Sequence, residues 1–245
     1  MQRWHVLLVA GLIGVASLLL VPFEALISKP LPPIALRGLA TLQPAILTAI
    51  AVLLGEITAR RVGLRAPLVD AWIAGNGAGK VFRHQWAPAL VVSITAAAVL
   101  LIYNATIGRD LLAGAGPHAR LASFDLPLIP KLLYGGVTEE ILTRWALVSL
   151  FVWLGWYLSG RPTKMSTPVL AGAVILAALL FAAGHLPFLY LVSPRASAGT
   201  VAAVLVGNAI PGTLFGWLFV RRGLEAAVLA HIGSHLLSAI AIAVV

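Results

Sequence analysis

The sequence has no cysteine and very few charged residues. Only 10% of its 245 residues are charged, whereas 60% are hydrophobic and the mean hydropathy is +1.00. The absence of cysteine excludes disulfides, thiolate metal sites and a cysteine nucleophile. A water-soluble domain of this size does not need so much apolar sequence, so the composition indicates a membrane protein.

The apolar residues are gathered in long blocks. A helix that crosses a bilayer needs roughly 20 predominantly apolar residues, and the blocks reach or approach that length. We therefore expect an all-α, polytopic transmembrane helical bundle of about seven spans, which makes the chain an integral, multi-pass membrane protein. The expected spans are residues 4–27, 38–55, 86–103, 128–157, 167–191, 200–220 and 224–245.

Most of the 17 lysine and arginine residues lie between the apolar blocks. In such connections, basic side chains anchor a membrane protein to anionic headgroups. The net charge of +9 is therefore interpreted as contact with the lipid bilayer, and no nucleic-acid partner is expected. Counting these residues over alternate connections puts the N-terminus in the cytoplasm and the C-terminus outside.

The most polar segment is residues 56–85. Within it, residues 75–80 read GNGAGK, which superficially resembles a phosphate-binding loop. In that motif a serine or threonine follows the lysine and holds magnesium, whereas Val81 occupies this position here. The stretch is interpreted as a flexible loop.

Within six positions of the fourth block stand three charged residues, Glu139, Glu140 and Arg144. An ionised side chain near the bilayer centre costs about 2.5–3.5 kcal/mol on insertion scales, so they should face the protein interior or a wet cavity. On a helix Glu140 and Arg144 are four residues apart and can pair, which leaves Glu139 as the free carboxylate. Gly135 and Gly136, just before the acidic pair, can loosen the helix there.

The later blocks contribute His185, Asn208, His231 and His235 to the intramembrane polar set. His231 and His235 are four residues apart, so both imidazoles project from one face of the last helix. Asn208 precedes Pro211, and we interpret it as a structural residue at a kink. A carboxylate beside imidazoles in a poorly hydrated cavity is a standard arrangement for a general base. The set predicts a catalytic site in the carboxyl-terminal half.

Three ordered motifs give this half a specific resemblance to a known family. They read Glu139-Glu140-Ile-Leu-Thr-Arg144, Phe181-Ala-Ala-Gly-His185 and His231-Ile-Gly-Ser-His235. In this order they resemble the CPBP family, which comprises the type II CAAX prenyl endopeptidases and bacterial relatives linked to bacteriocin processing or immunity. The resemblance covers residues 128–245, and the first three spans carry no recognised motif. We therefore expect three N-terminal spans and their loops in residues 1–127, and a four-helix catalytic core in residues 128–245.

The resemblance implies an intramembrane glutamic endopeptidase that needs no metal and no other cofactor. Glu139 is then the general base that activates water, and His185 holds and polarises that water. The implied partners are a peptide or protein substrate and the lipid bilayer, here the bacterial cytoplasmic membrane. Nothing in the sequence indicates an oligomeric state.

The resemblance also assigns roles to the remaining motif residues. Glu140 pairs with Arg144 and braces the helix, while His231 helps to hold the oxyanion that forms when water attacks a peptide carbonyl. The family usually has Asn or Asp where this chain has His235. An imidazole N–H can donate to an oxyanion as an amide does, although the ring is bulkier.

Three other functions stay open. A zinc-dependent protease would bind metal through His231, His235 and either Glu139 or His185, although the His-Glu-x-x-His signature is absent. A proton-coupled transporter would use the same groups as a relay, although no internal repeat is apparent. In a degenerate, non-catalytic membrane scaffold or immunity protein, His235 could stand where the family usually has Asn or Asp, because no catalysis depends on that position. Metal analysis, vesicle uptake and the Glu139→Gln variant distinguish these functions.

Overall fold

The structure, a computed structural model, describes residues 1–23, 32–114 and 126–244. Seven helical segments in these residues are long and apolar enough to cross a membrane. They are Arg3–Leu20, Pro33–Val62, Ala78–Ala105, Leu128–Leu158, Thr167–Leu191, Ala198–Arg222 and Leu224–Val244. The predicted polytopic, all-α bundle of seven spans is confirmed.

Several spans consist of more than one helical element. The first span is α1 (Arg3–Ser17) with η1 (Leu18–Leu20), the second is α2 (Pro33–Val62), and the third lies in α4 (Ala78–Gly114). The fourth is built from α6 (Leu128–Pro130), η4 (Lys131–Thr138), η5 (Ile141–Val148) and α7 (Ser149–Leu158). The last three are α8 (Thr167–Ala183) with α9 (Leu186–Val192), α10 (Ala198–Arg222) and α11 (Leu224–Val244), and the short α3 (Pro67–Ile73) precedes α4.

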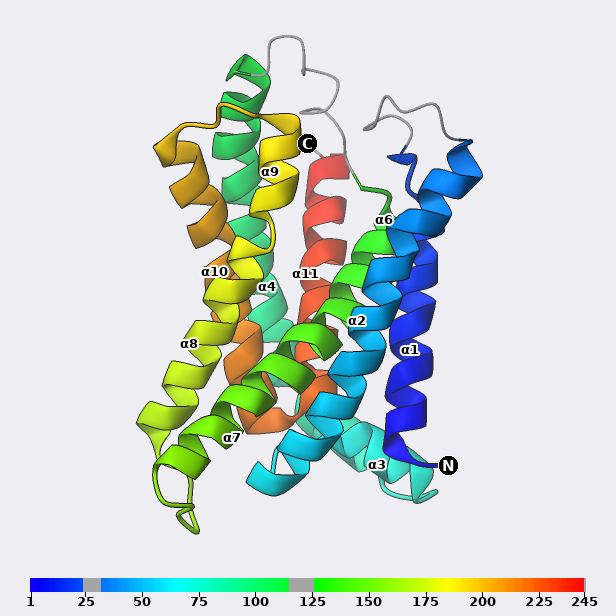
Figure 1. Ribbon diagram of the computed structural model, residues 1–245, viewed down its shortest axis with the longest axis vertical. Coiled ribbons are helices and arrows are strands. Elements are labelled where there is room, and N and C mark those ends of the chain that lie inside the picture. Colours follow the sequence, from blue (N-terminus) through cyan, green and yellow to red (C-terminus); the bar gives the residue numbers. More distant parts are fainter. Residues whose placement is uncertain (24–31, 115–125, 245) are drawn as a thin grey trace.

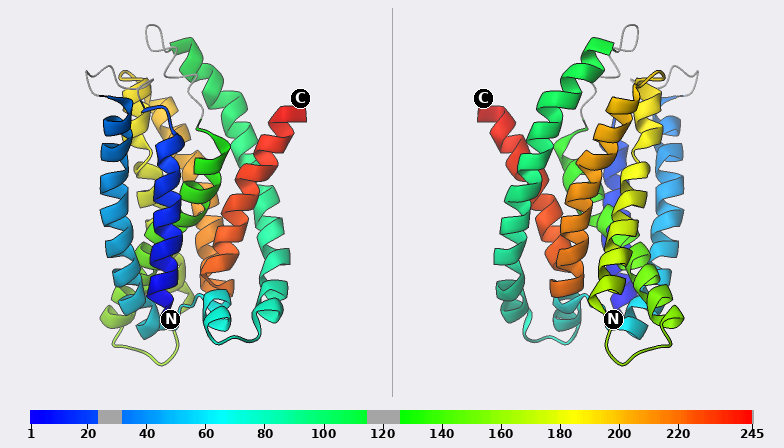
Figure 2. Two further views of the ribbon diagram at one scale, coloured as in Figure 1. Left: turned by 90° about the vertical axis from the view of Figure 1, so that its right-hand side faces the viewer. Right: turned by 90° about the vertical axis from the view of Figure 1, so that its left-hand side faces the viewer.

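The spans run along the long axis of the molecule, so the two termini lie at opposite ends (Figure 1). The N-terminus, α3 and the connection from α7 to α8 share one end, and the C-terminus lies at the other (Figures 1 and 2). This arrangement agrees with an odd number of membrane crossings. α11 packs along α4, and α10 packs against both α8 and α4.

The outer side of α2 shows how the bundle meets its surroundings. Large apolar side chains recur there at spacings of three and four residues, which places them on one helical face. These exposed side chains are Leu39, Leu42, Ile46, Ile50, Leu53 and Ile57. A contiguous exposed apolar surface of this kind suits contact with lipid rather than water.

The polar segment 56–85 is more helical than the sequence analysis predicts. α2 continues to Val62, α3 follows with Pro67 in its first turn, and α4 begins at Ala78. The turn before α4 is short, and in it Gly75 and Gly77 have φ of 70° and 74°. Positive φ favours glycine, so these two residues mark the turn. The loop predicted at residues 75–80 is shorter in the structure, because α4 already begins at Ala78.

The fourth span departs from α-helical geometry around the acidic pair. η4 and η5 are π-helical, and Glu139 and Glu140 lie between them. In a π-helix the hydrogen bonds connect residues five apart, and such turns are frequent at functional sites. Gly135 and Gly136, the predicted point of loosening, lie within η4.

Small residues let the first two spans approach the fourth closely. A Cβ on Gly11 would lie 3.2 Å from the side chain of Ile141, and a Cβ on Gly55 would collide with Trp145. The hydroxyl of Thr138 donates to the carbonyl of Gly11 at 2.8 Å. These contacts brace the segment that carries the acidic pair. The division into residues 1–127 and a catalytic core in residues 128–245 stays a prediction. The contacts of Gly11 and Gly55 with the fourth span join these two parts.

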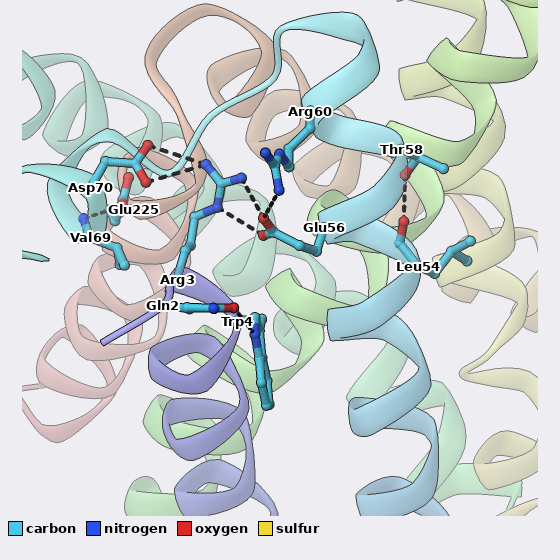
Figure 3. Close-up of polar contacts among 10 residues, drawn as sticks. All are labelled: Gln2, Arg3, Trp4, Leu54, Glu56, Thr58, Arg60, Val69, Asp70 and Glu225. Carbon is cyan, nitrogen blue, oxygen red and sulfur yellow. Dashed lines mark hydrogen bonds and ion pairs between the residues drawn. The ribbon is translucent and has the colours of Figure 1, made fainter.

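Partly buried polar contacts tie several helices together at the end that carries the N-terminus (Figure 3). Arg3 bonds both carboxylate oxygens of Glu56 at 2.9 Å and lies 3.3 Å from the carboxylate of Asp70. Glu225, in the first turn of α11, accepts from the backbone N–H of Val69 at 2.8 Å. The first contacts join α1, α2 and α3, and the last one fixes the start of α11 against α3.

Candidate active site

A buried carboxylate joins two helices at the centre of the candidate site. Oε1 of Glu140 lies 2.9 Å from NH1 of Arg144, which is the pair that the four-residue spacing predicts. The same oxygen lies 2.8 Å from Nδ1 of His231 on α11. All three residues are buried, and Oε2 of Glu140 has no hydrogen-bond partner among the described residues. Glu140 therefore connects the fourth and seventh spans, a contact that the sequence analysis does not predict.

The guanidinium of Arg144 is held from several sides. NH2 donates to the carbonyl of Gly212 at 2.9 Å, and NH1 also contacts the hydroxyl of Thr143. The guanidinium carbon lies 5.2 Å from the ring centroid of Phe181 and 5.5 Å from that of Phe215. A cation at this distance from an aromatic face is attracted by the ring. Arg144 therefore has a compensated charge and satisfied donors in an apolar interior.

The two histidines of α11 lie on one face, as their spacing predicts. Their rings are stacked, with centroids 4.9 Å apart. Both Nε2 atoms face Gly135, because a Cβ at that residue would lie 3.3 Å from Nε2 of His235 and 4.0 Å from Nε2 of His231. The absence of a side chain on Gly135 keeps the space in front of the two imidazoles open.

His185 stands at a break between two helices, where the sequence analysis predicts a continuous span. α8 ends at Ala183 and α9 begins at Leu186, with Pro187 in its first turn. Proline fits the start of a helix because it has no backbone N–H to leave unbonded. Nδ1 of His185 lies 2.9 Å from the carbonyl oxygen of Phe181. That oxygen only accepts, so Nδ1 carries the proton and Nε2 of the neutral ring presents a lone pair.

The ring of Phe181 connects histidines from different helices. It meets the ring of His185 edge-on with centroids 4.8 Å apart, and that of His231 in the same way at 6.4 Å. The ring of His235 in turn stacks on that of His231. The structure thus connects the three predicted imidazoles, His185 to His231 through Phe181 and His231 to His235 by direct stacking.

Glu139 lies on the fourth span, directly before Glu140. Its side chain is partly exposed, whereas that of Glu140 is fully buried. Its backbone carbonyl accepts from the hydroxyl of Thr143 at 2.5 Å. Its carboxylate has no hydrogen bond or ion pair within the part of the chain that the structure describes. Glu139 is therefore the free carboxylate of the acidic pair, and no direct bond between described residues joins it to an imidazole.

Two polar residues near the site bond to their own helices. Nδ2 of Asn208 donates to the carbonyl of Val204, and the hydroxyl of Ser234 donates to the carbonyl of His231, both at 2.8 Å. The contact of Asn208 agrees with the structural role predicted for it. Among the side chains that the structure describes, no three of His, Cys, Asp or Glu form a group that could hold a metal ion.

The sequence analysis misses the residues that shape the site without taking part in its chemistry. Phe215 stacks on the His231 ring with centroids 4.7 Å apart, and the carbonyl of Gly212 accepts from Arg144. Both residues belong to α10, which carries none of the three motifs. The only signal for them was the Pro211-Gly212 pair, which the sequence analysis used for a kink.

Comparison with known proteins gives one match. Residues 122–237, just under half of the chain, match the family described as Rce1-like: Type II CAAX prenyl endopeptidase Rce1-like. No curated protein and no solved structure matches the chain. The matched segment contains all three motifs, and the match confirms their resemblance to the CPBP family.

Proposed function

We propose, from the Rce1-like character of residues 122–237, that this protein is an intramembrane endopeptidase in which a glutamate activates the hydrolytic water. The family match and the seven apolar spans support a CAAX-type protease embedded in a membrane. The finer proposal concerns which groups do the chemistry. Peptide hydrolysis requires a base for the water and hydrogen-bond donors for the developing negative charge. The proposal assigns one base, one group that holds the water and two donors.

Glu139 is the proposed general base, and His185 the group that holds the water. The Glu139 carboxylate makes no hydrogen bond or ion pair with another described side chain, and the residue is only partly buried, which leaves this carboxylate available to a water molecule. His185 presents the lone pair of Nε2, because its Nδ1–H is donated to the carbonyl of Phe181. A water that donates one hydrogen to each of these groups is oriented with a lone pair free for attack.

His231 is the proposed first donor to the oxyanion. Its Nδ1 faces a carboxylate oxygen of Glu140 and therefore carries a proton. For Nε2 to donate as well, the ring must carry both protons, and the charge of Glu140 compensates the positive charge that results. In this scheme Glu140 positions the imidazole of His231 and stabilises its positive charge. Arg144 holds Glu140 in place.

His235 is the proposed second donor. Its ring stacks on that of His231, and the Nε2 atoms of both face the space beside Gly135. A substrate carbonyl oxygen placed there would receive two hydrogen bonds as it becomes negatively charged. Removing one such donor from an oxyanion site costs about 10²–10³ in rate in a well-studied protease.

The proposed reaction balances without any further reactant. The water oxygen attacks the peptide carbonyl carbon, one water proton passes to Glu139, and the carbonyl electrons form the oxyanion. When the oxyanion collapses, the carbon–nitrogen bond breaks and Glu139 returns the proton to the leaving amine. The products are a new carboxylic acid, which still carries the second water proton and ionises by releasing it to the new amine or to solvent, and a new amine; each side chain returns to its starting state.

The observation that carries the proposal is the buried Arg144–Glu140–His231 chain beside the free carboxylate of Glu139. A cleavage assay tests it: purified protein is incubated with a library of peptides, half of them prenylated, and products are identified by mass spectrometry. Internal cleavage by the wild type, and none by Glu139→Gln, supports the proposal. Cleavage by neither protein across the library, or equal cleavage by both, contradicts it.

A further inference from the structure

An open pocket that shares no residue with the candidate active site lies at the end of the molecule that carries the N-terminus. Its volume is about 500 Å³, and it is lined by Arg61, Trp153, Trp156, Tyr157 and Arg161. Arg61 lies at the end of α2, and the other four lie at the end of α7 and in the turn after it. These two helix ends reach the same end of the bundle (Figure 1).

Both arginines of this pocket are held by aromatic rings. The guanidinium carbon of Arg61 lies 5.7 Å from the ring centroid of Trp153, and that of Arg161 lies 5.9 Å from Trp156 and 4.8 Å from Tyr157. A guanidinium stacked on a ring keeps its in-plane N–H groups free for an acceptor. Both arginines are exposed, so the pocket presents two guanidinium groups that lie over aromatic rings and can donate to an acceptor.

The turn after α7 is shaped to bring Arg161 over these rings. Gly160 has φ of 80° and Arg161 has φ of 58°, the latter in a region that residues with side chains seldom adopt. The backbone N–H of Arg161 donates to the carbonyl of Trp156 at 2.9 Å, and Nε1 of Trp156 donates to the carbonyl of Pro162 at 3.0 Å. The turn is thus closed on the helix end, with the arginine fixed at its tip.

No carboxylate of the described side chains compensates these two arginines. Glu56 is paired with Arg3 and Arg60, and Asp70 is paired with Arg3. Glu139 and Glu140 belong to the candidate active site. Glu225 accepts from the backbone of α3 and from a glutamine side chain. Arg61 and Arg161 therefore carry positive charge without a described acidic partner.

We propose that this pocket binds a phosphate group at the boundary between membrane and water, as the headgroup of an anionic phospholipid or as free phosphate. Planar guanidinium groups match phosphate oxygens in geometry and charge. Tryptophan and tyrosine are typical of the headgroup level of a bilayer. Basic pockets between transmembrane helices bind anionic headgroups at this level.

Native mass spectrometry of the detergent-purified protein tests this inference. Palmitoyl-oleoyl phosphatidylglycerol, the matching phosphatidylcholine and inorganic phosphate are titrated separately, and the bound fraction is measured. We expect tighter retention of phosphatidylglycerol than of phosphatidylcholine. The double variant R61Q/R161Q should lose about 30-fold in affinity, which corresponds to the contribution of two arginines near a membrane surface.

The double variant R221Q/R222Q is the matched control. It removes two arginines from the same end of the molecule, one of them stacked on Trp217 at 4.8 Å, but neither lines the pocket. Binding that falls only in R61Q/R161Q supports the pocket, whereas an equal fall in both variants overturns it.

Binding of inorganic phosphate without preference for phosphatidylglycerol assigns the pocket to free phosphate. Binding of neither ligand overturns the inference. The variant R61K/R161K keeps both positive charges but loses the planar sets of guanidinium N–H donors. It should bind phosphatidylglycerol more weakly than wild type while showing the same helicity.

Discussion

Oε1 of Glu140 lies 2.8 Å from Nδ1 of His231, and the two residues come from different spans. Arg144 shares the same oxygen at 2.9 Å, so one carboxylate faces two groups that can carry positive charge. The site therefore depends on Glu140 for its assembly as well as for its electrostatics. The neighbouring Glu139 has no such contacts in the described part of the chain. The two adjacent acids should respond very differently to substitution.

Glu140→Gln should destabilise the protein strongly. The amide removes the negative charge between Arg144 and His231 and leaves a buried guanidinium uncompensated. Breaking a buried ion pair in this way costs about 3–5 kcal/mol, and chemical unfolding in detergent measures it. Arg144→Met is the partner variant, and its effect should not add to that of Glu140→Gln, because both break the same pair. A Glu140→Gln protein as stable as wild type would refute the structural role of this residue.

Alanine substitutions at the two glycines of η4 should have different effects, one on the cleavage rate and the other on stability. A methyl group on Gly135 would lie 3.3 Å from Nε2 of His235, inside the proposed oxyanion site. One on Gly136 would collide with the side chain of Ile232 and lie 3.3 Å from its backbone. We expect Gly135→Ala to lower the cleavage rate at nearly unchanged stability, and Gly136→Ala to lower the melting temperature. The reverse pattern would show that the space beside Gly135 is not used.

His235 offers a direct test of the second donor. His235→Ala removes the proposed N–H, so the cleavage rate should fall by about 10²–10³. His235→Asn supplies an amide donor of the kind usual in the CPBP family and should stay within about tenfold of wild type. Steady-state cleavage of one library peptide by the three proteins measures this. Equal rates for the Ala and Asn variants would remove His235 from the oxyanion site.

Chelation distinguishes the proposed mechanism from a zinc-dependent one. The proposal uses only side chains and water, so prolonged treatment with a chelator should leave the cleavage rate unchanged. Metal analysis of the purified protein should find less than one equivalent of zinc. If the chelator abolishes cleavage and added zinc restores it, His231 and His235 act as metal ligands instead.

The spans were predictable because the physical signal is strong and local. About 20 apolar residues in a row have few alternatives to a membrane helix, and all seven blocks formed one. The extra helical turns at residues 56–62 and 78–85 were not predicted, because polar residues extend a span as readily as apolar ones once it leaves the lipid. The π-helical geometry of η4 was also missed, although the loosening at Gly135 and Gly136 was expected.

The site was predictable where the residues are close in sequence and not where they are distant. The pairs Glu140–Arg144 and His231–His235 follow from helical spacing alone. The bond between Glu140 and His231 spans 91 residues and depends on how two helices pack, which the spacing of residues does not encode. The same holds for the bond from Arg144 to the carbonyl of Gly212, which belongs to another span.

The cleavage rate of Glu139→Gln, measured beside its stability, tests the central claim most directly. Loss of a general base lowers rates by about 10²–10⁴, whereas a carboxylate without described partners contributes little to folding. We predict a fall of that size on the best library peptide, with a free energy of unfolding within about 1 kcal/mol of wild type. A Glu139→Gln protein that still cleaves at the wild-type rate would contradict the account.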